Sequence, residues 1–145
     1  MIQSVSQIAA GLANYKDDTF GDFVFSVNLI NTEFGDVIEV FSNDDSEKVP
    51  VYIHKDDEQI RVVSELWPVS YIKPELRELV WVDLLKLSLI MPLSSFGIDS
   101  SSEENTVVLF GSLSSESSLN NLAEEVLELI SNAKEAIKIG VDFLQ

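Results

Sequence analysis

An alternation of apolar and polar residues runs through residues 20–67 and constrains the fold more than any other feature of the sequence. Successive side chains of a strand point to opposite faces of a sheet, so a period of two predicts half-buried strands. The strand segments lie at residues 23–30, 36–41, 49–54 and 59–67. The turns between them are short and rich in Asn, Asp, Ser and Lys, which leaves no room for parallel crossovers. An antiparallel meander of three to four strands is therefore the simplest topology.

Helical periodicity precedes and follows this meander. Apolar residues recur at three- and four-residue steps in residues 2–13, and again beyond Lys73, where Pro74 occupies a first helical position. We expect this second helix to end at Pro92. A third, longer helix carries one apolar stripe over residues 119–141.

Two further strands are predicted between the second and third helices. They cover residues 93–98 and 106–113, and the acidic, Ser-rich loop 99–105 joins them. Ser117 or Ser118 is the expected N-cap of the helix that follows. The order is helix, meander, helix, two strands and long C-terminal helix. Because helices separate groups of antiparallel strands, the sequence predicts an α+β fold.

The second helix has more apolar surface than one sheet can cover. Trp81 and Leu85 lie off its main stripe and widen its apolar sector well past a single face. Two explanations stay open for this surplus. Either the helix is sandwiched inside the domain and buried on more than one side, or it meets a second subunit in a homodimer.

The charge of the chain excludes whole classes of partner. The 145 residues fit a single α+β domain over 1–145, with 9 Lys and Arg against 25 Asp and Glu, a formal net charge of −16. Nucleic acid and anionic membrane surfaces are polyanions that bind clustered basic residues, so we expect neither as a partner. No secretory signal pattern is visible, and the longest apolar stretch, 79–92, is shorter than the roughly 20 residues that span a bilayer. We expect a cytoplasmic protein without direct membrane insertion.

Chemistry-bearing motifs are scarce. The chain has no cysteine and a single histidine, His54, and its glycines and serines form no phosphate-binding loop or nucleophile motif. Asp56 and Asp57 lie close to His54 in the sequence, so a small-ligand site, a metal site or an enzyme centred on these carboxylates and His54 is the alternative hypothesis. Turns and solubility also require such residues. We therefore predict no catalytic, cofactor-binding or metal-binding residue, no cofactor, and a protein that is not an enzyme.

The outer face of the meander is the better candidate for a functional surface. If Ile53 faces Ile60 and Val51 faces Val62 on the core side, the opposite face carries the intervening residues of both strands. Aromatic residues and Arg, which are enriched at protein interfaces, are among them. A helix covering this face is the competing explanation. The predicted interaction residues are Tyr52, Arg61, Val63 and Trp67 on the sheet, with Trp81 and Leu85 on the second helix.

Several segments resemble the YjfI family, a group of uncharacterised small bacterial proteins. They are MPLSSF at 91–96, FGSLS at 110–114 followed by Ser117, Ser118, Glu124 and Glu125, and VDFLQ at 141–145. The resemblance covers mainly residues 50–145. It implies a bacterial cytoplasmic protein of unknown function, linked to membrane stress through neighbouring genes, and it brings no catalytic residue.

The order of elements is also similar to that of type III secretion chaperones, which are α+β dimers that bind unfolded segments of other proteins. Similarity of architecture does not transfer function, so this comparison carries only the fold. Absent catalytic motifs, surplus apolar helix surface and acidic charge together favour a non-enzymatic protein-interaction or chaperone-like module. Its partner is expected to be another protein, and a homodimer is one of the expected assemblies.

Overall fold

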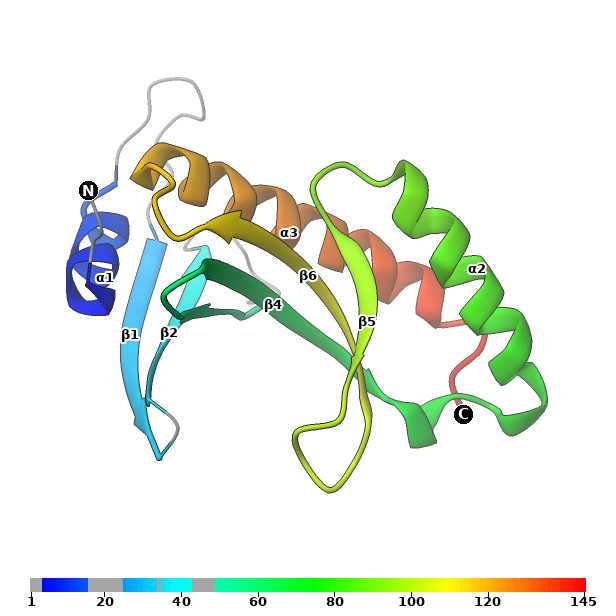
Figure 1. Ribbon diagram of the computed structural model, residues 1–145. Coiled ribbons are helices and arrows are strands. Elements are labelled where there is room, and N and C mark those ends of the chain that lie inside the picture. Colours follow the sequence, from blue (N-terminus) through cyan, green and yellow to red (C-terminus); the bar gives the residue numbers. More distant parts are fainter. Residues whose placement is uncertain (1–3, 16–24, 34, 43–48) are drawn as a thin grey trace.

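A computed structural model describes residues 4–15, 25–33, 35–42 and 49–145 of the chain. These residues form a single six-stranded antiparallel sheet, in which the strands lie in the order β1-β2-β3-β4-β6-β5 (Figure 1). The strands are β1 (Phe25–Thr32), β2 (Gly35–Ser42), β3 (Val51–Lys55), β4 (Gln59–Pro68), β5 (Ser95–Asp99) and β6 (Thr106–Ser114). The predicted meander is present as β1 to β4, and the α+β fold is confirmed. Residues 23 and 24 of its first predicted strand lie outside the described residues.

The two later strands join the same sheet. Strand β6 pairs with β4 along its length, from Gln59 opposite Ser114 to Pro68 opposite Thr106, and β5 then pairs with β6 at the edge. The chain therefore returns to the middle of the molecule after the second helix. This pairing brings residues that are far apart in the sequence onto one surface.

Three α-helices pack against the sheet in the described part of the chain. They are α1 (Val5–Ala13), α2 (Arg77–Ile90) and α3 (Leu119–Gly140), and a short 3-10 helix at Pro74–Leu76 leads into α2. Ser4 and Gln7 form a capping box at the start of α1, and the Ser118 hydroxyl accepts a hydrogen bond from the Asn121 amide at the start of α3. Of the two expected caps, Ser118 is the one used. None of the described helices is both long enough and apolar enough to cross a membrane.

Helix α3 supplies most of the helical side of the core. Its apolar stripe packs on one face of the sheet, and α1 lies beside it over β1 (Figure 1). Burial of such a stripe is the main source of stability for a helix of this kind. The largest side chains that are fully buried are Ile8, Leu12, Ile38, Val40, Val51, Ile53, Ile60, Val62, Ile72, Leu109, Leu122 and Leu129. We call the face of the sheet that α3 and α1 cover the inner face, and the opposite face the outer face.

Trp67 belongs to the inner face, so its predicted place on the outer face is wrong. The register of β4 against β6 shifts between Glu65 and Trp67, and this irregularity reverses the direction of the side chains that follow. Trp67 is only 6% exposed. Its ring meets Phe143 edge-on at 5.2 Å between centroids, and it lies directly against Gly140 at the end of α3.

Helix α2 packs on the edge of the sheet rather than inside the molecule. Val80 and Leu84 are its buried residues, and the Ser88 hydroxyl accepts a hydrogen bond from the Phe96 amide of the edge strand β5 at 2.9 Å. On the other side of the helix, Leu85 and Leu89 are 68% and 89% exposed. The expectation that α2 is buried on more than one side is therefore wrong.

The connection from α2 to β5 is held by a buried polar contact. The Asn132 side-chain amide on α3 donates hydrogen bonds to the Pro92 carbonyl at 2.9 Å and to the Ser94 hydroxyl at 3.0 Å. Both acceptors belong to the MPLSSF segment, so its polar groups are satisfied inside the fold. Leu93, between them, has a φ of +61°, in the left-handed region.

Substitution of Gly140 tests the close approach of α3 to Trp67. A Cβ at position 140 would collide with the indole ring, so we expect Gly140→Ala to lower the free energy of unfolding by about 1–3 kcal/mol, although alanine is the better helix former. Urea denaturation measures the change. Ile139→Ala, at the half-exposed neighbouring position, is the control and should stay within about 0.5 kcal/mol. A Gly140→Ala variant as stable as the wild type would contradict this packing.

Glu125 makes the stability of the fold sensitive to pH. Its side chain is buried between α3 and β6, over Gly111, and burial, aided by the nearby Glu128, raises its pKa above the ordinary value. Between the unfolded and folded pKa values the folded protein binds more protons than the unfolded chain. Stability from this group is therefore lost as pH rises through that window.

Glu125→Gln should remove this loss, because glutamine does not ionise. The stability of Glu125→Gln relative to the wild type is expected to increase as the pH rises from about 4, near the ordinary pKa of glutamate, through the raised pKa of Glu125 in the folded protein. Unfolding curves for both proteins across this range measure the difference. Glu124→Gln, at the exposed neighbouring position, should show no such increase. Parallel pH profiles for wild type and Glu125→Gln would disprove the effect.

Candidate binding cleft on the outer face of the sheet

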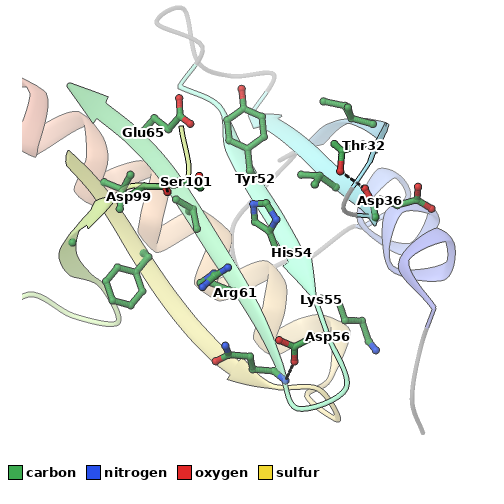
Figure 2. A pocket seen from close by; sticks show the side chains of 18 of the residues that line it. Thr32, Asp36, Tyr52, His54, Lys55, Asp56, Arg61, Glu65, Asp99 and Ser101 are labelled. Atoms are coloured by element: carbon green, nitrogen blue, oxygen red, sulfur yellow. Dashed lines mark hydrogen bonds between the residues drawn. The ribbon is translucent and has the colours of Figure 1, made fainter. Parts of the chain in front are cut away.

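The outer face of the sheet, opposite α3, is hollowed by a cleft of about 990 Å³. Residues from all six strands line it, and Figure 2 shows the central side chains rising from neighbouring strands. The competing expectation, that a helix covers this face, is wrong for the described residues, because α3 packs on the other side and α1 contributes only Val5 to the cleft lining. A concave surface of this size with mixed lining is a typical binding site.

The floor of the cleft is built by three central strands in register. Tyr52 on β3 lies opposite Val63 on β4, and Val63 in turn lies opposite Phe110 on β6. One step along, His54 faces Arg61. Adjacent outward positions of paired strands hold their side chains within contact distance. The floor is therefore a band of aromatic and aliphatic groups beside one imidazole and one guanidinium.

Phe110 owes its position to a glycine on the neighbouring strand. A Cβ at Gly97 of β5 would lie 3.0 Å from the Phe110 ring, closer than side chains normally approach. The absence of a side chain at 97 lets the phenyl ring lie across the edge strand. The apolar floor therefore extends from β3 to β5.

A small electrostatic cluster occupies the middle of the cleft. Partial burial, followed by the positive charge of Arg61, lowers the pKa of His54, while Asp99 on β5 acts in the opposite direction. Hydrogen bonds from Ser101 hold the pKa of Asp99 below its ordinary value, and Arg61 and His54 add to this. At neutral pH the cluster therefore holds a neutral imidazole, a carboxylate and a guanidinium.

The rim of the cleft is acidic. Its charged lining residues are Asp36, Asp56, Glu65 and Asp99 against Lys55 and Arg61, four carboxylates to two cations. Figure 2 shows Glu65 and Asp99 on one side of the Tyr52–His54–Arg61 row and Asp36 on the other. The pKa of Tyr52 is also raised. Its partial burial is the main cause, and Glu39, which accepts a hydrogen bond from the Tyr52 hydroxyl, is the next. The cleft thus combines an apolar floor with a net negative border.

The structure places the predicted interaction residues in three different environments. Tyr52, Arg61 and Val63 lie on the predicted outer face and line the cleft, whereas Trp67 is in the core. Trp81 is partly buried against the core, and Leu85 lies on the exposed side of α2, away from the cleft lining. The residues that sequence reasoning missed are Gly97, Asp99, Val108 and Phe110. Only the pairing of β6 with β4 and of β5 with β6 brings them to this face.

The alternative centre at His54, Asp56 and Asp57 is not assembled as a metal site. Asp56 serves the β3–β4 turn, where its carboxylate accepts hydrogen bonds from the amides of Glu58 and Gln59, both at 2.8 Å. Asp57 is exposed and does not line the cleft. In the part of the chain that the structure describes, no three His, Cys, Asp or Glu residues are grouped as they would be around a metal ion.

Comparisons with known proteins agree with the sequence resemblance. A 60-residue segment is 38% identical to the uncharacterized protein YjfI of Escherichia coli strain K12, and covers 41% of this chain and 45% of that protein. The same values hold for YjfI of E. coli O157:H7. The match thus spans less than half the length of these curated relatives.

The fold itself has a solved counterpart. The crystal structure of YbjN from E. coli, described as a proposed transcription regulator, superposes with a TM-score of 0.66 over 100% of this chain and 97% of its own, at 13% identity. At this identity the similarity shows the fold and nothing of function. The model of one family matches residues 4–144. The chain therefore belongs to the family of uncharacterized proteins conserved in bacteria (DUF2170), and its predicted membership of the YjfI group is confirmed.

Proposed function

We propose that this protein is a non-enzymatic, chaperone-like interaction module that holds an extended segment of another protein in the cleft of its outer sheet face. The open cleft itself carries this proposal. A sheet face left uncovered usually becomes polar, yet this one keeps Tyr52, Val63 and Phe110 on its floor. Such an apolar, concave surface with a polar rim is suited to a peptide-like ligand.

The charges of the cleft define the chemistry of the segment. Four carboxylates against two cations favour a partner that carries Lys or Arg between apolar side chains. The overall charge of −16 strengthens the attraction at long range and speeds association. The link to membrane stress rests on the family resemblance alone and stays a prediction.

Defined peptides test this proposal. We expect a fluorescent peptide of alternating Lys and Leu or Phe residues to bind with a Kd in the micromolar range, and its Glu-substituted version not to bind. Glu65→Lys and Asp99→Lys should each weaken binding about tenfold, and added salt should weaken it further. Fluorescence anisotropy measures all of these affinities.

A matched variant separates the cleft from the overall charge. Glu124→Lys changes the net charge by the same amount as Glu65→Lys but lies on the exposed side of α3. It should leave the peptide affinity nearly unchanged. Equal losses for Glu124→Lys and Glu65→Lys would mean that only the total charge attracts the peptide. Binding of small carboxylic acids near Arg61 and His54, with no peptide binding, would instead support the small-ligand alternative.

A further inference from the structure

Helix α2 presents an apolar surface to solvent on the side that faces away from the sheet. On its inward side, Val80 and Leu84 are buried in the core, and the Ser88 hydroxyl is hydrogen-bonded to β5. The exposed side carries Leu79, Val82, Leu85, Leu89 and Ile90, which are between 48% and 89% exposed. Single exposed apolar residues are ordinary, but five on one face of a 14-residue helix are not. We call these five residues the α2 face.

We infer that the α2 face is the interface of a homodimer, in which the α2 helices of two copies pack antiparallel. Local charge favours α2 as the contact between two copies. Two copies that each carry −16 repel one another over most of their surface. Helix α2 holds Arg77 and Lys86 against Glu78 and Asp83, so its own charge sums to zero. The approach of a second copy is therefore least opposed at this helix.

The sequence of α2 is also complementary to itself in an antiparallel pair. In a two-fold dimer the same surface meets itself, so each residue needs a suitable partner on the same helix. An axis between positions 84 and 85, near the middle of α2, brings Asp83 of one copy to the height of Lys86 of the other, and the reverse. The same axis brings Leu79 of one copy to the height of Ile90 of the other copy. The two charged residues named here thus each meet an opposite charge on the other copy, and the two apolar residues each meet an apolar residue.

The size of the surface also fits a second copy. Leu93, directly after α2, is 58% exposed and extends the apolar area. Together these side chains offer apolar surface on the order of several hundred Å², at the upper end of what monomers expose. A standard interface buries about 800 Å² per partner, and the polar surroundings of α2 would supply the remainder. An anionic bilayer is a poorer occupant, because the chain carries −16.

Sedimentation equilibrium of the full chain tests the homodimer. At about 10–100 µM, in the micromolar range of moderate association, we expect a mass of twice 16.1 kDa for the wild type. Leu85→Glu should shift it to 16.1 kDa. Ile139→Glu places the same charge at a half-exposed apolar position on α3 and should remain dimeric. Circular dichroism verifies that both variants are folded.

A charge exchange tests the antiparallel arrangement. Asp83→Lys and Lys86→Asp should each weaken dimerisation about tenfold, and the double variant should restore it, because every cross-copy pair is again opposite in sign. A monomeric wild type at about 100 µM would overturn the inference, whether the α2 face then bound a phosphatidylglycerol vesicle or another protein. A dimer that persists in Leu85→Glu would overturn it equally. Failure of the double variant to restore association would exclude this packing of the helices.

Discussion

Burial of the α3 stripe against the inner face of the sheet is the contact on which the rest of this structure depends. It fixes which side of every strand is core, because a strand cannot shift by one residue without exposing its apolar side chains. Val62 and Leu109, from strands nearly fifty residues apart, are both fully buried beneath this layer. The chain forms one sheet because α3 offers one continuous surface for all its central strands.

One layer of helices on one face leaves the other face to the solvent and to partners. The outer face accordingly carries the cleft, with its apolar floor and acidic rim, and the sheet edge carries α2. The two surfaces are chemically distinct. The cleft is concave and its border is negative, which suits a basic segment, whereas the α2 face is apolar on a helix whose charges cancel, which suits a second copy.

Local features of the fold could be predicted from the sequence, and long-range ones could not. The period of two located β1 to β4 and placed Tyr52, Arg61 and Val63 on the outer face. The predicted hairpin register was wrong by two residues, because Ile53 pairs with Val62 and not with Ile60, but a shift of two keeps every side chain on its face. Nothing local showed that β6 would pair with β4, so Phe110 and Asp99 were missed as cleft residues. Trp67 was misplaced because the irregularity falls at Leu66, between Glu65 and Trp67, and interrupts the alternation that the prediction extended to residue 67.

Strands β3, β4 and β5 bring His54, Arg61 and Asp99 into one cleft on the open face of the sheet. His54 is the only histidine, so an NMR titration of its ring protons reads this cluster without ambiguity. We predict a pKa below the ordinary value for histidine, which rises in Arg61→Ala and falls further in Asp99→Asn. An ordinary pKa that neither substitution moves would show that these side chains do not meet, and would contradict the account.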